Sequence, residues 1–202
     1  MTTNDFIQQL ASSAPVPGGG GASALVGGMG VALCAMVANL TSGKKKYQAH
    51  QTDIETVLQR TDAAIKRLLS LVDEDAVVFE PLSRAYGLPK DEPNRAEIIE
   101  AALVTACTVP MNIMREIEAI ADVLHILAQK GTKLAISDVG VAATALRAGI
   151  EGAALNVYIN TKLMKNRQLA QSLNQEAQAM AERIIPACQI IYAQVMEGLV
   201  TS

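Results

Sequence analysis

The chain has 202 residues and a formal net charge of −3 at pH 7, with 17 Lys and Arg against 20 Asp and Glu. Half of its residues are hydrophobic, but only 3% are aromatic and Trp is absent, so small and aliphatic side chains fill the core. This length suits one domain, which we expect over residues 1–202, and the slightly acidic charge excludes nucleic acid as a bulk electrostatic partner.

The three cysteines indicate a reducing compartment. Cys34, Cys107 and Cys188 are far apart and embedded in apolar residues, and the sequence has no CxxC or Cys/His spacing. We therefore expect free buried thiols rather than disulfides, and no metal site. The N-terminal residues lack a basic segment and include Asp5, unlike a signal peptide. These features together predict a cytoplasmic protein.

The expected helices begin with a short one, which is capped by Thr3 or Asn4 and runs to about Ser12. The next, over residues 22–41, is uncharged and has small residues at every fourth position, which permits close helix packing. Its length and apolar character would also suit a membrane span. It lacks an aromatic belt, however, and a helix that is apolar all round is typical of the centre of a helical assembly. We therefore expect a buried helix that ends at Gly43, and no membrane partner.

A proline- and glycine-rich loop precedes this uncharged helix. Consecutive glycines maximise the entropy of the unfolded chain, so a folded protein retains them where side chains would obstruct something. One reading is a ligand close to backbone N–H groups at a helix N-terminus, where the donors and the dipole favour anionic groups. The other reading is a flexible connector, and the pattern matches no common phosphate-binding motif. The residues concerned are Pro17, Gly18, Gly19, Gly20 and Gly21.

Helical patterns continue to the end of the chain, with no strand or hairpin pattern. Ser137 and Asp138 predict the start of one small-residue helix, with either residue as its cap. The sequence thus predicts an all-α fold, a multihelical bundle of long kinked helices, and the apolar small-residue faces predict a homodimer. Three other long helices each contain a proline: 51–86 with a kink or break near Phe79 before Pro81, 94–129 with Pro110, and 166–199 with Pro186.

Five segments, taken together, resemble one known family. That family comprises the cyclodeaminase domain of formiminotransferase-cyclodeaminase and the stand-alone bacterial methenyltetrahydrofolate cyclohydrolases. The resemblance implies an all-helical, intertwined dimer that binds a tetrahydrofolate derivative, which can be polyglutamylated, beside the glycine loop. The segments are PVPGGGGASAL, MVANLTSGKKKY, LVDEDAVVFEPLSRAYGLPK, KGTKLAISDVGVAATAL and EGAALNVYIN.

The family catalyses two reactions at the one-carbon bridge between N5 and N10 of tetrahydrofolate. One reaction adds water to the methenyl ring and gives 10-formyltetrahydrofolate. The other releases ammonia from 5-formimidoyltetrahydrofolate and closes that ring. Since the sequence has no transferase domain, we expect the cyclohydrolase, with the cyclodeaminase or a non-catalytic folate-binding protein as alternatives. The methenyl carbon is already electrophilic, so the resemblance implies no metal and no cofactor beyond the folate substrate.

Two positions depart from the family pattern. Gly21 stands where the family usually has Ser, so a contact made by that hydroxyl would have to come from the backbone, from Ser23 or from water. Thr132 stands where the family often has Asn. Both departures bear on substrate specificity more than on the fold.

Two carboxylates are candidates for the group that takes a proton from water and complements the cationic carbon. Asp138, in the SDVG segment, is the first candidate, and its alternative is a plain helix cap. Asp75 is the second, because it lies beside apolar residues and matches a family carboxylate, whereas its neighbours Asp73 and Glu74 are expected to be solvated.

The remaining candidates would bind the substrate. Lys44, Lys45 and Lys46 either complement a helix dipole in solvent or capture the anionic glutamate tail of folate, with Lys45 as a candidate proton donor. Asn156 and Asn160 are four residues apart on one helix, in an apolar segment. Their amides would bond either to the pterin ring or to neighbouring helices.

Overall fold

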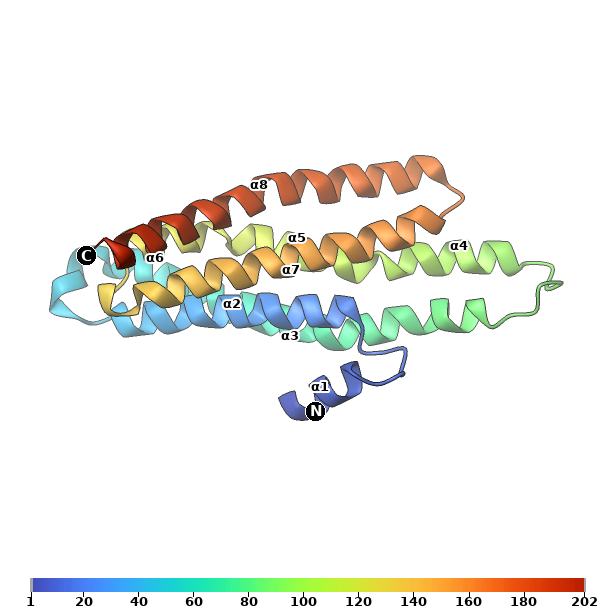
Figure 1. Cartoon of the computed structure of the whole chain (residues 1–202), viewed down its shortest axis with the longest axis horizontal. Coiled ribbons are helices and arrows are strands. Elements are labelled where there is room, and N and C mark those ends of the chain that lie inside the picture. Colours follow the sequence, from blue (N-terminus) through green and yellow to red (C-terminus); the bar gives the residue numbers. More distant parts are fainter. Residues whose placement is uncertain (1, 202) are drawn as a thin grey trace.

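A computed structural model describes residues 2–201, so the limits of the predicted domain, residues 1 and 202, lie outside it. Within the described range all regular structure is helical, which confirms the predicted all-α class, and the long helices form a bundle (Figure 1). Short 3₁₀ segments at Lys45–His50 and Lys133–Ala135 connect some of them. The helices are α1 Thr3–Leu10, α2 Gly19–Thr41, α3 Gln51–Tyr86, α4 Arg95–Ala106, α5 Thr108–Ile120, α6 Asp122–Lys130, α7 Ile136–Leu163 and α8 Arg167–Val200.

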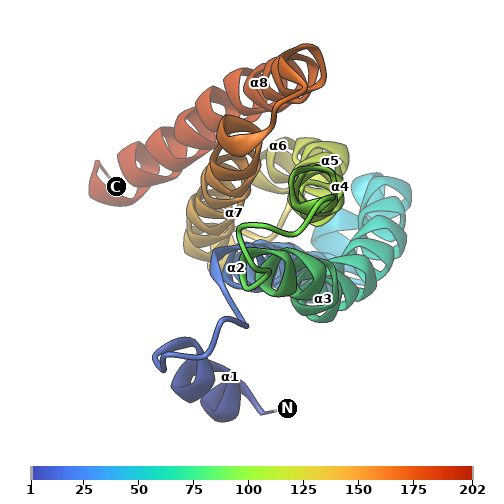
Figure 2. The same ribbon diagram turned by 90° about the vertical axis from the view of Figure 1, so that its right-hand side faces the viewer.

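The uncharged helix α2 lies between α3 and α7 (Figure 2). Glycines bring α2 and α7 close together: a Cβ added at Gly149 would lie 3.2 Å from the Gly27 Cα and 2.9 Å from Ile117 Cδ1. A Cβ at Gly30 would lie 3.1 Å from the carbonyl oxygen of Ala142. Gly27 contacts Gly149, whereas Gly30, further along α2, contacts the earlier residue Ala142, so the two helices are antiparallel. The small residues of α2 thus support close helix packing, as the sequence indicates, and the helix they pack against is α7.

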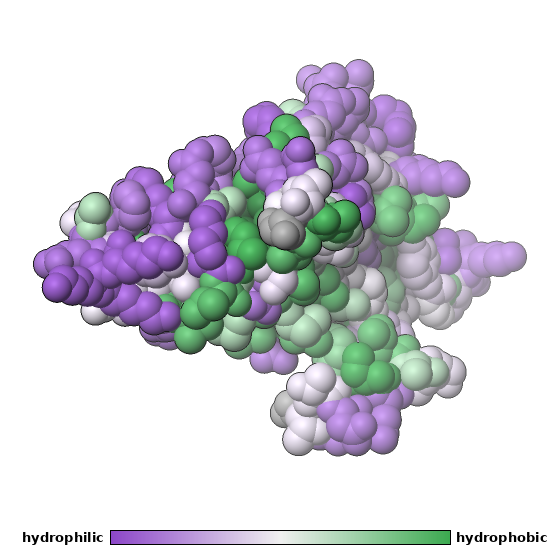
Figure 3. Space-filling view, turned by 60° about the vertical axis from the view of Figure 1, so that its left-hand side comes forward, coloured by the Kyte–Doolittle hydropathy of each residue, from purple (hydrophilic) through white to green (hydrophobic). Residues whose placement is uncertain are grey.

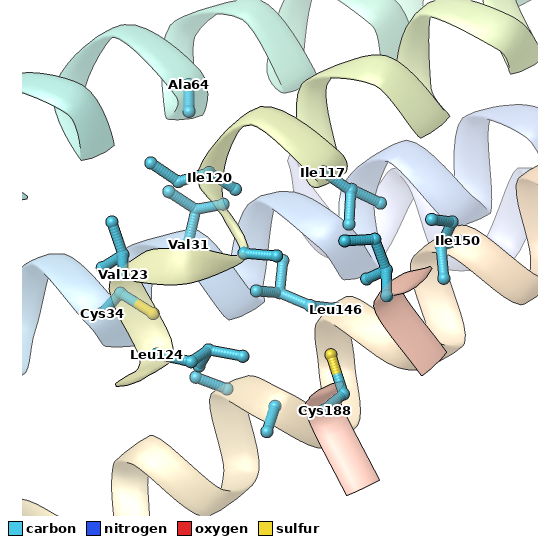
Figure 4. Close-up of a cluster of buried hydrophobic side chains, with 14 of the residues drawn as sticks. Val31, Cys34, Ala64, Ile117, Ile120, Val123, Leu124, Leu146, Ile150 and Cys188 are labelled. Carbon is cyan, nitrogen blue, oxygen red and sulfur yellow. The ribbon is translucent and has the colours of Figure 1, made fainter. Parts of the chain in front are cut away.

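Aliphatic side chains and cysteines fill the interior of the bundle. The main core joins α2, α3 and α5–α8, and Figure 4 shows Val31 and Cys34 of α2 facing residues of α5, α6 and α7. Cys34, Cys107 and Cys188 are free and buried, as the sequence predicts. Two segments, Gly19–Thr41 and Arg95–Lys130, are long and apolar enough to cross a membrane. The apolar window of α2 is 56% buried inside the bundle, which is the behaviour of a core helix.

Several predicted helix boundaries are wrong. The expected helix 94–129 is three helices, with breaks at Cys107 and Ala121, and Pro110 lies in the first turn of α5. Proline is tolerated there because the first N–H groups of a helix have no intrahelical acceptor. By contrast, α3 continues without a break through Pro81, and α8 continues through Pro186.

Of the predicted helix caps, those of α1 and α7 are wrong and that of α2 is confirmed. α1 is capped by Thr2, whose Oγ1 accepts from the Asp5 N–H at 3.1 Å, and not by Thr3 or Asn4. α7 begins at Ile136, with no side-chain cap, so Asp138 lies in the first turn instead of capping it. The prediction for Gly43 is confirmed: it follows the C-cap of α2 with φ +71°. A left-handed conformation costs glycine little because it has no Cβ.

The close approach of α2 and α7 leads to a stability prediction. Gly149→Ala should lower the free energy of unfolding by about 1–3 kcal/mol, because the new methyl group has no room between α2 and α5. Urea denaturation measures the change. Gly198→Ala is the control, since a Cβ there meets nothing within 4 Å, and it should leave the stability unchanged or slightly higher. Equal effects from the two variants would contradict the role given to the glycine contact.

Candidate active site

A pocket of about 200 Å³ lies at the N-terminal end of α2. Four parts of the chain meet there: the loop and first turn of α2, the C-terminal half of α3, the junction of α4 and α5, and the C-terminal half of α7. We call it the glycine-loop pocket. It is lined by Pro15, Val16, Gly18, Gly19, Gly20, Asp75, Val78, Phe79, Ala106, Pro110, Asn156, Ile159 and Asn160.

Asp75 and the first turn of α2 form the polar wall of the pocket. The Gly21 N–H donates to Asp75 Oδ2 at 2.8 Å, so a carboxylate of α3 satisfies one of the free N–H groups at the start of α2. A Cβ at Gly20 would lie 2.1 Å from Asp75 Oδ1, a contact that no side chain could make. Gly20 is therefore required for this approach. A Cβ at Gly21 would meet only ordinary contacts, 3.5 Å or longer, so the space at this position does not by itself require glycine.

The environment of Asp75 opposes its ionisation. Burial raises the pKa of its carboxyl above the ordinary value, and the hydrogen bond from the Gly21 N–H only partly offsets this effect. Such a combination of partial burial, a raised pKa and a position in a pocket is typical of groups that exchange protons with a ligand. Asp75 is thus the strongest candidate for acid–base chemistry in the pocket.

Asn156 and Asn160 form the opposite wall. The Asn156 Nδ2 donates to the Gly152 carbonyl at 2.8 Å, and the Asn160 Nδ2 donates to the carbonyls of Asn156 at 3.0 Å and Ala106 at 3.3 Å. Among the described residues, neither side-chain oxygen has a donor. The Asn160 amide thus ties α7 to the end of α4, whereas the Asn156 amide bonds within α7. Contact of either side-chain oxygen with a ligand stays a prediction.

Ser23 belongs to the helix interface rather than to the pocket lining. Its Oγ donates to the Gly19 carbonyl at 2.6 Å, and the side chain is 7% exposed. A Cβ at Gly152 would lie 2.4 Å from that Oγ, so α7 covers the hydroxyl directly. Its predicted contact with substrate stays a prediction.

The other predicted site residues lie at the far end of α2. Lys44 and Lys45, at its C-terminal end, line a separate pocket of about 320 Å³, and Lys46 lies beside them. Asp138 is half-buried in the first turn of α7 and makes no hydrogen bond or ion pair with residues 2–201. Eighteen residues of helix, or about 27 Å, separate Asp138 from Asn156. Within one chain the structure therefore does not bring Asp138 and the lysines to the pocket.

Thr132 also lies at this far end. It is buried, and its N–H donates to Thr41 Oγ1 at 2.8 Å. This bond ties the start of α7 to the end of α2, so the departure from Asn at this position lies far from the glycine-loop pocket.

Some pocket residues were missed in the sequence. Phe79 follows Asp75 by four residues on α3, so helical periodicity alone would have placed both on one face. Ala106 and Pro110 had no such signal. They reach the pocket because the chain breaks between α4 and α5, which the sequence did not predict.

The fold and the pocket define an all-helical domain with a half-buried carboxylate held at a glycine-rich helix start. A sequence model of the family described as formiminotransferase-cyclodeaminase matches residues 2–179. This chain therefore belongs to the formiminotransferase-cyclodeaminase family, as its resemblance in sequence indicated.

Individual relatives cover nearly all of the chain. A methenyltetrahydrofolate cyclohydrolase of Methylorubrum extorquens is 42% identical over 91% of this chain and 93% of its own length. The formimidoyltransferase-cyclodeaminase of Sus scrofa is 34% identical over 89% of this chain, which spans only 35% of that relative. The crystal structure of a formiminotetrahydrofolate cyclodeaminase from Thermotoga maritima has a TM-score of 0.88 and 30% identity, covering 99% of this chain and 98% of its own.

The raised pKa of Asp75 has a consequence for stability. The Asp75 carboxyl binds its proton more tightly in the folded than in the unfolded state. Its contribution to the free energy of unfolding is therefore lost as the pH rises through the pKa of the folded state. Asp75→Asn should therefore raise the free energy of unfolding at neutral pH, and the gain should shrink in acid, where the wild-type carboxyl is also neutral. Urea denaturation at several pH values measures this, with the exposed Asp73→Asn as control. A variant less stable than the wild type at neutral pH would contradict the prediction.

Proposed function

We propose that this chain hydrolyses 5,10-methenyltetrahydrofolate to 10-formyltetrahydrofolate. The observation that supports this most is the Asp75 carboxylate, half-buried against the free N–H groups of α2 in a pocket. The cyclohydrolase of Methylorubrum extorquens, similar over nearly the whole of both chains, supports the same reaction.

Asp75 fits the proposed chemistry in two ways. The methenyl carbon lies between N5 and N10 and shares their positive charge, so a nearby carboxylate stabilises the bound cation. As water adds to this carbon, Asp75 takes a proton from it. The bond from the carbon to N5 then breaks, N5 receives a proton, and the formyl group remains on N10. One water is consumed and one proton is released, and the proposed reaction draws on no metal or cofactor beyond the substrate.

The polar groups around Asp75 suit the pterin ring. The side-chain oxygens of Asn156 and Asn160 can accept from its ring N–H and amino groups. The free N–H groups of Gly19 and Gly20 can donate to its carbonyl oxygen. Together they would fix the orientation of the ring, so that its one-carbon bridge faces Asp75.

The cyclodeaminase reaction is the second candidate function. Similarity to the Thermotoga maritima and Sus scrofa proteins favours it, because both are named for that activity. The same carboxylate would serve it, acting on a formimino carbon with ammonia as the leaving group. The third possibility, a folate-binding protein without turnover, would show binding but neither reaction.

A direct assay tests the cyclohydrolase. Purified protein should accelerate the loss of the near-ultraviolet absorbance of methenyltetrahydrofolate above the spontaneous rate. Asp75→Asn should reduce turnover roughly a hundredfold or more, because the amide cannot take a proton. For the wild type, kcat/KM should fall in acid, because the Asp75 carboxylate becomes protonated. Asp73→Asn should retain wild-type rates. Wild-type turnover in Asp75→Asn would remove Asp75 as the base, and ammonia release from 5-formimidoyltetrahydrofolate alone would favour the cyclodeaminase.

We further propose that the chain acts as a homodimer whose site uses both ends of α2. This helix has no charged residue, yet it exposes Met29, Met36 and Leu40, and the neighbouring α7 exposes Leu155 and Ile159. In Figure 3, α1 is at the bottom of the view, and exposed apolar side chains form a band across the molecule above it. Soluble monomers rarely expose a continuous apolar surface of this kind, whereas protein–protein interfaces commonly do.

A twofold axis that passes through this face perpendicular to α2 would make α2 antiparallel to its copy. The far end of the partner, with its Asp138 and the three lysines Lys44, Lys45 and Lys46, would then lie beside the glycine-loop pocket. In this arrangement Asp138 would share the handling of the water proton, and Lys45 would protonate the leaving nitrogen. Lys44 and Lys46 would attract the outer residues of a polyglutamate tail.

Mixed dimers test the shared site. Asp75→Asn and Asp138→Asn should each be inactive alone, whereas the two variants, refolded together, should regain about a quarter of wild-type activity, because half of the dimers then hold one intact site. Mixing each variant with itself is the control. An active Asp138→Asn protein, or no recovery in the mixture, would contradict the shared site.

A further inference from the structure

We propose that the folate substrate extends from the glycine-loop pocket into a second pocket beside it, where Arg84 binds the carboxylate groups of the glutamate tail. This inference rests on the proposed function, because it assigns the position of the substrate of that reaction.

The glycine-loop pocket is too small for a whole tetrahydrofolate. Its volume is about 200 Å³, whereas pockets that enclose a drug-sized ligand measure roughly 300–1,000 Å³. A tetrahydrofolate consists of a pterin, a benzoyl ring and at least one glutamate, so only part of it fits. The rest must leave through an adjoining space.

Such a space exists on the other side of Phe79. A pocket of about 490 Å³, here called the tail pocket, shares Pro15, Val16 and Phe79 with the glycine-loop pocket. It continues along α3 through Ala76, Val77, Glu80, Ser83 and Arg84. Because the two pockets share these three lining residues, they are adjacent, and we place the path of the substrate past the Phe79 side chain.

The lining of the tail pocket changes from apolar to charged along α3. Val77 is 68% exposed, which is unusual for a valine, and it adds apolar surface to the tail pocket that Phe79 also lines. This part suits the benzoyl ring, since aromatic rings pack well against apolar side chains and one another. Ser83 and Arg84 follow one turn later and offer a hydroxyl and a guanidinium group.

The spacing along α3 agrees with the order of groups in folate. Asp75 and Arg84 are nine residues apart, which corresponds to about 14 Å of helix. In the substrate, the benzoyl ring separates the reacting carbon from the glutamate carboxylates. Nine residues are two and a half turns, so Arg84 leaves α3 on the side opposite Asp75. With the carbon at Asp75 and the ring at Phe79, the carboxylates would therefore meet Arg84 by following the tail pocket around the helix.

Charge identifies Arg84 as the group that receives the tail. Among the described residues that line the two pockets, Arg84 is the one with a positive charge. The lysines at 44–46 of the same chain lie at the other end of α2, about 35 Å away, and those of the proposed second copy are assigned only to the outer residues of a polyglutamate tail. In the absence of substrate, Arg84 Nη2 pairs with Glu80 Oε1 at 2.5 Å, and both side chains are exposed. Exposed pairs of this kind contribute little, so a substrate carboxylate can replace Glu80 on a guanidinium that favours two-point binding.

The test compares a substrate that has the glutamate with one that lacks it. KM is measured for methenyltetrahydrofolate and for methenyltetrahydropteroate, which ends at the benzoyl carboxylate. Arg84→Gln should raise KM about fivefold for the first substrate, leave KM for the second nearly unchanged, and leave kcat unchanged for both. Glu80→Gln should have the opposite effect and lower KM for the glutamate substrate, because it frees Arg84. Lys66→Gln is the matched control, since Lys66 forms an exposed pair with Asp62 on the same helix but lines neither pocket.

The outcomes separate this inference from the proposed function. If the wild type binds tetrahydrofolate but turns over neither substrate, the function fails, and the same variants are compared by equilibrium binding of tetrahydrofolate and tetrahydropteroate. An unchanged ratio of KM or Kd between the two ligands in Arg84→Gln would overturn the inference. A ratio that responds to replacement of Lys44, Lys45 and Lys46 but not of Arg84 would also overturn it, and would assign the tail to the lysines.

Discussion

The close contact between α2 and α7 is the constraint on which the rest of the structure depends. Gly27 and Gly149 let the two backbones approach, and the antiparallel register that results places Gly19 beside Asn156. At the other end, the same register joins Thr41 to Thr132. One packing interaction therefore positions the α2 and α7 sides of the glycine-loop pocket, together with Asp138 and the lysines at the far end, whereas Asp75 is positioned by α3. A side chain at the crossing would separate the helices and disturb both ends together.

Asp75 shows how the fold accommodates a group that does not favour burial. The bundle places this carboxylate in a partly apolar pocket, where its charged form is disfavoured, and supplies one hydrogen bond from the Gly21 N–H. Gly20 leaves room for it. A neutral side chain would suit the fold better, so the carboxylate is best explained by its chemistry.

The candidate site residues form two groups at opposite ends of α2. Asp75, Asn156 and the glycine loop lie at one end of α2, and Asp138 and the lysines lie at the other. A rigid helix cannot bring its two ends together, so one chain cannot combine these groups in one site. If Asp138 and the lysines act on the same substrate as Asp75, as we propose, a second copy must supply them, and the uncharged exposed side of α2 is the surface that this copy would cover.

The sequence by itself determined the all-α class, the burial of α2, the free cysteines and the candidates Asp75, Asn156 and Asn160. These features follow from composition and helical periodicity, which are local properties, or from similarity to a family. Only the tertiary structure decided that residues 94–129 form three helices and that Ala106 and Pro110 reach the pocket. It also decided that Asp75, rather than Asp138, faces the glycine loop. Periodicity says which face of a helix is buried, but which residues meet across 54 positions of sequence, as Gly21 and Asp75 do, depends on how the helices pack.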